Sequence, residues 1–416
     1  MYRYIDSFWE NTALPALMDF IRIPNISPAF DPNWADKPHA EAALMYLYHW
    51  AEKQLPNNAQ IDILRLPEKT PVLLINIPGN SEKHALYYGH YDKQPPASGW
   101  SEGLGPYTPM IRDGRLYGRG SGDDGYALFA AIGSILALKT TNQPHPHVQI
   151  LIEGSEESGS PDLLHYIDAF AHKIHQPDCV ICLDSGCGDY DRLWLTNSLR
   201  GLVSGRLHIQ ILTEAVHSGM AGGALPSVFQ IMQEKLSAIT HPGSMSFNLA
   251  ALQTTIPTHC QSAITDTARI LGDRIYQDFP LHKHTQPLST EPSTLLRAQT
   301  WGNAYEIIGI DGIPSISDAG NVHHHQITAQ LSVRIPPNCN SQEAGKALQK
   351  ALNTNSPYGA DCQFELEHCA NGWYDRNNAA WLQPAAQAAS QAFFEQDCAY
   401  LGEGGSIPFI LSLIHI

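Results

Sequence analysis

The chain has 416 residues, of which 43% are hydrophobic and 16% are charged, a balance typical of globular proteins and not of disordered ones. Its formal net charge of −16 argues against nucleic-acid binding, because phosphate contacts need clustered lysine and arginine. We also expect no membrane span and no secretion signal, because apolar runs of about 18 residues are absent and the N-terminal stretch carries acidic residues.

The first part of the chain alternates between helical and strand patterns. The spacing of apolar residues predicts helices at 1–22, 38–55, 126–138 and 161–172, and strands at 61–66, 72–77, 85–88, 147–153 and 179–183. Strands that alternate with helices predict an α/β catalytic domain with a mixed, mostly parallel sheet flanked by helices. In such sheets, ligand sites gather at the carboxyl ends of the strands.

A second pattern begins near residue 198. We expect strands at 202–212, 305–310, 326–335 and 361–367 and helices at 225–238 and 341–353, while 240–300 looks rich in loops. This set predicts a smaller inserted α+β domain over 198–371, which the family resemblance given below implies to be a lid and dimerisation domain. The catalytic domain would then comprise 1–197 and 372–410, with a helix at 378–394 after the chain returns to it.

Eight cysteines show no disulfide spacing, which predicts a reducing, cytoplasmic compartment. Cys179 and Cys182 form a CxxC inside an apolar strand. Because a spacing of three puts them on opposite faces of the strand, we expect core thiols and no zinc or redox site.

The apolar strand at Ile150–Ile152 leads to two adjacent carboxylates, Glu156 and Glu157. Two carboxylates buried at the end of a strand are unfavourable without a cation. A divalent metal would use one carboxylate as a ligand and leave the other as a base. Three more candidates are His90, Asp123 and Asp184. Taken singly, each has an ordinary explanation, as a core histidine, a helix N-cap or a turn residue. Together they favour a metal site, because they fall at separate strand or helix ends of one α/β unit.

The ordered set GHYD, GRGSGDD, EGSEESGS, VHSG and GEGGSIP resembles the dinuclear metallo-exopeptidases. That family includes carboxypeptidase G, cytosolic non-specific dipeptidase, carnosinase and acetylornithine deacetylase. The resemblance runs from about residue 10 to residue 410 and is strongest to the dipeptidase branch. It implies hydrolysis of dipeptides or short peptides at the C-terminal residue, by a water that bridges two metal ions.

The resemblance also implies roles at the metal centre. His90 and Asp184 would bind the first ion, Asp123 would bridge both ions and Glu157 would bind the second. Glu156 would be the general base, and Asp92 would hydrogen-bond the far nitrogen of His90. The ions would be zinc, with manganese or cobalt as alternatives, because histidine and carboxylate ligands suit all three. The Asp123–Asp124 peptide bond is a candidate for the cis form.

For the substrate, the resemblance implies that Arg334 binds the C-terminal carboxylate of a small peptide, since a guanidinium pairs with it bidentately. Asn321 would lie beside the substrate. His217 would stabilise the oxyanion across the subunit interface of a homodimer formed through the lid domain; the alternative is an ordinary loop histidine. Gly404, Gly405 and Ser406 would close the carboxylate pocket. The run 323–325, three histidines, is expected to be structural, because successive strand residues point opposite ways.

Four positions depart from the family pattern and concern substrate details. Gly125 and Tyr126 stand where the family has lysine and glycine, Ala215 replaces an aspartate and Gly402 replaces an arginine.

The end of the chain departs further. Only ten residues follow Ser406, and His415 lies too close to the GEGGSIP motif to match the family's second-site histidine. The tail 411–416 coincides with a translated sequencing-library adapter, so we hypothesise a truncated fragment with a non-native tail and impaired turnover. Two alternative functions remain: an N-acyl amino acid deacylase that uses the same centre, and an inactive or non-catalytic metal-binding protein.

Overall fold

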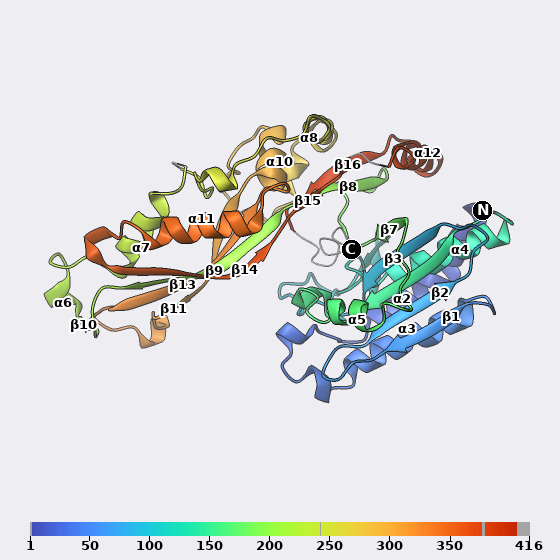
Figure 1. Ribbon diagram of the computed structural model, residues 1–416, viewed down its shortest axis with the longest axis horizontal. Helices are drawn as coiled ribbons and strands as arrows, with labels where there is room; N and C mark the ends of the chain where they lie inside the picture. Colours follow the sequence, from blue (N-terminus) through green and yellow to red (C-terminus); the bar gives the residue numbers. More distant parts are fainter. Residues whose placement is uncertain (1, 242, 377–378, 406–416) are drawn as a thin grey trace. The chain divides into compact units, whose positions relative to one another are not determined.

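The computed structural model describes residues 2–241, 243–376 and 379–405 (Figure 1). These residues form two compact units, divided between Ser185 and Gly186. The second unit includes the described residues after 372, which we had assigned to the catalytic domain. The predicted domain boundaries remain a prediction.

The first unit is built on a five-stranded sheet. Its strand order is β1 (Gln60–Leu64), β2 (Val72–Ile77), β6 (His147–Glu153), β3 (His84–His90) and β7 (Cys179–Cys182). β3 runs parallel to β6 and to β7, whereas β1 and β2 pair antiparallel. The register sets His84 opposite His147 at one end of the sheet and His90 opposite Glu153 at the other. The predicted mixed sheet is confirmed.

Helices cover both faces of this sheet. Neighbouring strand residues point to opposite sides, so each face has its own apolar side chains to bury. Ile150 packs in a core with helices α1 (Tyr2–Phe8), α2 (Leu14–Ile21), α3 (His39–Gln54) and α4 (Ala127–Thr140). Leu151 packs in a second core with helix α5 (Leu163–Ala169). Burial on both faces explains why the centre of β6, Ile150–Ile152, is apolar at three successive positions. A small hairpin of β4 (Met110–Arg112) and β5 (Arg115–Tyr117) lies outside this sheet.

The second unit contains an antiparallel four-stranded sheet in the order β11 (Ala304–Asp311), β13 (Gln326–Ile335), β9 (Gly201–Gln210) and β14 (Asp361–Ala370). Burial alternates along β9 and β13 with the period of two expected for a half-buried strand. The buried side chains pack against helices α7 (Val228–Ser237) and α11 (Ser341–Asn353). Two short strands, β10 (Val216–His217) and β12 (Val322–His323), pair beside helix α6 (Ser218–Ala221).

The expectation of loops over 240–300 is wrong. That span holds α8 (Thr258–Leu271), α9 (Arg274–Gln277) and α10 (Pro292–Trp301). The buried residues of α8 recur at the spacing of a helix, at Cys260, Ile264, Ala268 and Leu271, so this helix carried a signal that the expectation of loops overlooked. The start of α10 also carried a signal, since the Glu291 side chain caps the helix just before Pro292.

A three-stranded sheet in the second unit was also missed. β8 (Trp194–Leu199) pairs with β15 (Trp373–Tyr374) and with β16 (Ala399–Glu403), which follows helix α12 (Leu382–Phe394). Its strands lie far apart in sequence, so no local pattern predicts their pairing.

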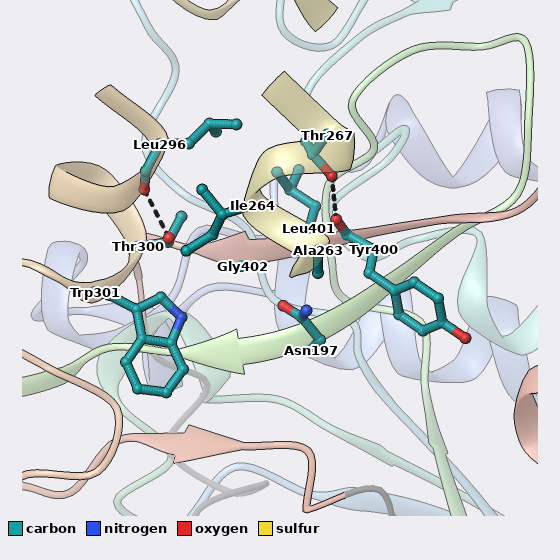
Figure 2. Close-up of a pocket in the computed structure, with 10 residues that line it drawn as sticks. All are labelled: Asn197, Ala263, Ile264, Thr267, Leu296, Thr300, Trp301, Tyr400, Leu401 and Gly402. Atoms are coloured by element: carbon teal, nitrogen blue, oxygen red, sulfur yellow. Dashed lines mark hydrogen bonds between the residues drawn. The ribbon is translucent and has the colours of Figure 1, made fainter. Parts of the chain in front are cut away.

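A small cavity borders this sheet beside α8 and α10 (Figure 2). Its volume is about 10 Å³, room for at most about one water. The hydroxyl groups at its wall are already used: Thr267 donates to the Tyr400 carbonyl and Thr300 to the Leu296 carbonyl. The cavity is therefore a packing gap and no substrate site. Within the described residues, no helix is long and apolar enough to span a bilayer.

Candidate metal centre

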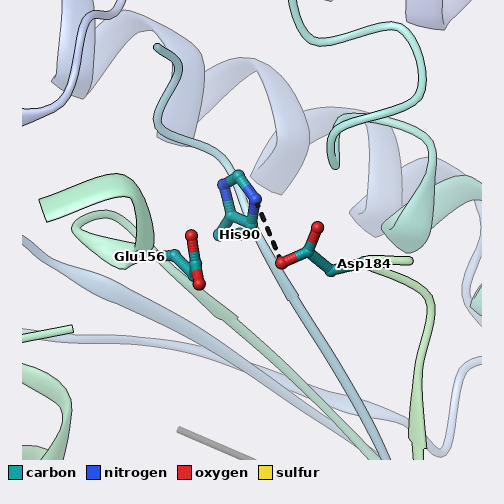
Figure 3. Close-up of side chains that lie close together, drawn as sticks. All are labelled: His90, Glu156 and Asp184. Atoms are coloured by element: carbon teal, nitrogen blue, oxygen red, sulfur yellow. Dashed lines mark ion pairs between the residues drawn. The ribbon is translucent and has the colours of Figure 1, made fainter. Parts of the chain in front are cut away.

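Three chain segments bring polar side chains to one edge of the first unit's sheet. His90 is the last residue of β3, Glu156 begins a short 3-10 turn after β6, and Asp184 follows β7 by two residues. Because the three strands are parallel, their carboxyl ends meet at this edge. The three side chains converge in Figure 3.

The distances define two sets of possible metal ligands. His90 Nε2 lies 3.1 Å from Asp123 Oδ1 and 3.7 Å from Asp184 Oδ2. His90, Glu156 and Asp184 form one set, and His90, Asp123 and Glu157 form the other. In each set the ligand atoms all lie within 4.8 Å of one another. The structure thus brings together the four predicted ligands and the predicted base.

Asp92 lies beneath these ligands and is itself buried. Its carboxylate accepts hydrogen bonds from the backbone amides of Glu156 and Glu157, each at 3.1 Å. His90 Nδ1 lies 3.0 Å from the Asp92 carbonyl oxygen and 3.4 Å from its carboxylate. With Nδ1 donating to the carbonyl, Nε2 keeps a lone pair for a metal. Asp92 therefore positions the histidine and both glutamates.

The centre is rich in buried negative charge. Burial raises the pKa of Glu156 to about 9, and burial together with the charge of Asp123 raises the pKa of Glu157 to about 7. Burial also raises the pKa of Asp184, whereas a hydrogen bond from His90 lowers the pKa of Asp123. Glu157 Oε1 is buried without a hydrogen-bond partner. Crowded carboxylates and an unpaired oxygen fit divalent cations, which would neutralise both.

Two residues that the sequence analysis missed support the ligands. The Gln94 side-chain amide donates to Glu157 Oε2, and Asp124 Oδ2 accepts from the His90 backbone amide at 3.3 Å. Gln94 lies two residues beyond Asp92 in the GHYDKQ stretch, so its place next to that motif was the available signal. The Asp123–Asp124 peptide bond is cis, as predicted.

The departures at Gly125 and Tyr126 have a structural explanation. A Cβ atom at Gly125 would lie 2.3 Å from the Gly120 carbonyl oxygen and 2.7 Å from the Phe20 ring, so no side chain fits there. The Tyr126 hydroxyl donates to the carbonyl of Leu183, the residue before Asp184. Tyr126 thus anchors the segment that carries one ligand.

In the second unit, two predicted substrate residues come together. β10 and β12 pair, and the Ser218 amide donates to the Asn321 carbonyl at 2.9 Å, which sets Asn321 beside His217. His217 Nδ1 accepts from the Gly219 amide at 3.0 Å. In the neutral ring the proton is therefore on Nε2, and the exposed side chain is a hydrogen-bond donor.

Arg334 and Gly404 gather at the other end of that unit's main sheet, around an arginine that the sequence analysis missed. Arg200 donates from Nε to the Gly404 carbonyl at 3.1 Å and from Nη1 to the Gly302 carbonyl at 3.2 Å. Burial, and then the charge of nearby Arg334, lower the pKa of Arg200 to about 10. Two partly buried guanidinium groups side by side favour an anionic ligand.

Some predictions fall elsewhere. Gly405 follows Gly404 in the described chain, but Ser406, His415 and the tail 411–416 lie outside the described residues. His323 Nε2 lies 3.1 Å from the Pro226 carbonyl oxygen, and the histidine run 323–325 contributes to neither ligand set among the described residues. This agrees with its expected structural role.

Histidine and carboxylate ligands at the carboxyl ends of parallel strands, next to a buried glutamate, define a metal-dependent α/β hydrolase. More narrowly, the chain belongs to Peptidase family M20/M25/M40, whose sequence profile matches residues 86–406.

Its relatives are dipeptidases. The cysteinylglycine-S-conjugate dipeptidase of Corynebacterium striatum is 25% identical over 402 residues, which cover 94% of this chain and 83% of that protein. The Cys-Gly metallodipeptidase dug1 of Schizosaccharomyces pombe is 26% identical over 359 residues, covering 81% and 72%. The solved structure of the dipeptidase Dug1p from Saccharomyces cerevisiae has a TM-score of 0.74 at 23% identity, covering 99% and 88%.

These comparisons confirm the predicted family, the fold class and the class of enzyme, a metal-dependent hydrolase of the dipeptidase type. The roles of single residues stay predictions.

Proposed function

We propose that this chain hydrolyses dipeptides at a centre where His90, Asp123, Glu157 and Asp184 hold two divalent ions, with zinc as the preferred metal. The observation that carries the proposal is the pair of ligand sets that share His90, with Glu156 a member of the set that contains Asp184. When bound, the ions polarise the scissile carbonyl and lower the pKa of the attacking water.

Glu156 takes the proton from that water and returns it to the leaving amine. Its raised pKa, due first to burial, makes the protonated acid accessible near neutral pH. Its backbone amide is held by Asp92, which keeps the carboxylate at the edge of the ligand sets.

Arg334 binds the free C-terminal carboxylate of the substrate, and Arg200, which lies between β8 and β9, supports it. Both guanidinium groups are partly buried, which strengthens their pairing with an anion. Gly404, Gly405 and Ser406 close the pocket. This arrangement selects substrates with a free carboxyl end.

His217 stabilises the oxyanion through Nε2–H, with Asn321 beside it. These two residues lie next to the start of β13, whereas Arg334 lies near its end, eight residues further along. At the rise of a β-strand this separates them by about 27 Å. This separation supports the proposal that a second copy supplies the His217–Asn321 pair to the dipeptide that Arg334 binds.

The end of the lid sheet that carries His217 also exposes apolar side chains. Met220 is 82% exposed and Ile316 96%. Exposed apolar side chains of this size near one another are typical of protein–protein interfaces. They support a homodimer formed through this end of the lid.

The substrates we propose are dipeptides of the Cys-Gly type, on the strength of the relatives' activities. All eight cysteines are free, which supports a reducing compartment such as the cytoplasm.

A substrate panel tests this function. After reconstitution with Zn²⁺, Mn²⁺ or Co²⁺, we expect hydrolysis of Cys-Gly and other free-amine dipeptides, and weaker hydrolysis of N-acetyl and N-succinyl amino acids. The reverse preference would show the deacylase alternative to be correct.

Glu156→Gln should lower kcat by about 10²- to 10⁴-fold, with unchanged metal content by elemental analysis. The control is Glu52→Gln, an exposed glutamate on α3 that should leave both unchanged. Retained activity in Glu156→Gln would contradict the assigned base.

A further inference from the structure

Three histidines cluster at the end of the first unit's sheet that is remote from the metal centre. His84 begins β3, His147 begins β6 and the two pair across the sheet, while His175 lies in the loop before β7. His84 and His90 are six residues apart on β3, a distance of about 20 Å along the strand. The cluster is therefore separate from the catalytic ligands.

The three rings are close to one another. Their centroids lie 5.2 Å apart for His84 and His147, 5.4 Å for His84 and His175, and 5.5 Å for His147 and His175. Imidazole nitrogens about 2.0–2.1 Å from a tetrahedral zinc ion place the ring centroids about 5.2 Å apart. The centroid spacing matches that of three imidazoles around one ion, whereas the ring nitrogens of these three described residues do not all lie within 4.8 Å of one another, so the rings must turn to bind.

Two ring nitrogens in the cluster lack partners. His84 Nδ1 and His147 Nε2 are buried and have no hydrogen-bond partner. Buried polar atoms without a partner are uncommon, because each costs about 1–3 kcal/mol. Burial, together with the neighbouring histidines, lowers the pKa of His147, so the ring stays neutral, which is the form that binds metals.

The backbone around the cluster is held in place. Gln149 on β6 accepts from the His175 amide at 2.8 Å and donates to the Lys173 carbonyl at 2.7 Å, which ties the His175 loop to the sheet. Asp178 accepts from the His84 amide at 2.9 Å and pairs with Lys83 at 2.8 Å. These bonds fix all three backbones, so only ring rotations are needed to aim the nitrogens.

We propose that His84, His147 and His175 form a second metal site, which binds one transition-metal ion of the zinc class independently of the catalytic centre. Imidazole ligands suit zinc, copper and nickel, in contrast to the oxygen ligands preferred by magnesium and calcium. Three histidines leave a fourth position for water. The ion would join two strands and a loop and so stabilise the first unit.

The test uses the full chain with His90→Ala and Glu157→Gln, because His90 is the residue that both ligand sets of the catalytic centre share. In this background we expect about one equivalent of Zn²⁺ in calorimetric titration, and a Co²⁺ absorption spectrum of nitrogen ligation. Loss of a supporting residue around a metal typically costs 10- to 100-fold in affinity, so His175→Ala, which removes a ligand, should cost at least about 100-fold. Zn²⁺ should raise the Tm of the background protein but not of the His175→Ala variant.

His172→Ala is the matched control, because His172 is an exposed histidine of the same loop region outside the cluster. It should bind Zn²⁺ as the background protein does. His147→Asn gives a second, independent loss of affinity, and circular dichroism checks that each variant folds. Equal Zn²⁺ affinity in the background protein, His175→Ala and His147→Asn would overturn the proposal and leave the cluster as stacked neutral rings.

Discussion

Replacing Asp92 with asparagine tests how the metal centre is held together. Both Asp92 carboxylate oxygens accept backbone amides, one from Glu156 and one from Glu157. In Asp92→Asn, one oxygen becomes an NH₂ group that cannot accept a hydrogen bond. One glutamate amide is then left facing a donor in a buried site.

The expected loss has two parts. An unpaired buried amide costs about 1–3 kcal/mol of stability. Disturbing the support of a ligand lowers metal affinity by about 10- to 100-fold. That factor corresponds to about 1.4–2.7 kcal/mol of binding free energy. Both glutamates should be affected, because they share this one carboxylate.

The assay combines urea unfolding with metal titration against a competing chelator. Asp162→Asn is the matched control, because Asp162 accepts from the Thr70 amide at 2.9 Å and from the Thr70 hydroxyl at 3.0 Å, away from the metal ligands. It should lower stability while leaving metal affinity unchanged. If Asp92→Asn kept its metal affinity within about twofold of the original chain, Asp92 would not position the ligands as argued.

Three further changes probe the fold and the substrate pocket. Gly154→Ala would set a Cβ atom 2.3 Å from the Tyr91 hydroxyl oxygen and should cost about 1–3 kcal/mol in urea unfolding; an unchanged midpoint would contradict the packing. Arg200→Lys should raise KM by about tenfold or more through loss of the bidentate fork, whereas exposed Arg206→Lys should not, and equal KM values would exclude Arg200 from the pocket. Burial lowers the pKa of Lys93 from 10.5 to about 7, so below pH 7 the folded chain holds a buried ammonium group that lowers its free energy of unfolding. This penalty disappears as the pH rises from 7 towards 10. The free energy of unfolding should therefore rise relative to that of Lys93→Met between pH 7 and 10, and a constant difference between the two proteins would refute the shifted pKa.

The candidate metal ligands were predictable because their signals are local. An apolar strand followed by a histidine or a carboxylate marks the carboxyl end of a buried strand, and parallel strands bring such ends together. His90, Glu156 and Asp184 were found in this way, and the order of the surrounding motifs indicated the family. The strands of the lid were found from their alternation, which reflects burial on one face.

Other features depend on contacts between distant parts of the chain. Arg200 meets Gly404 across more than two hundred positions, and Asp92 reaches the Glu156 and Glu157 amides across more than sixty. The pairing of β8 with β16 was missed for the same reason, because these strands lie far apart in sequence. The helices at 258–271 and 292–301 were missed although they carried local signals, a regular buried stripe in the first and a side-chain cap in the second.

The sequence by itself therefore determined the types of ligand, the strand ends that carry them and the class of chemistry, because these follow from hydrophobic patterning and ligand chemistry. Only the tertiary structure decided which groups orient the ligands. It also decided that His84, His147 and His175 share one corner, because strand register sets His84 opposite His147 and a loop held by Gln149 brings the third ring to them.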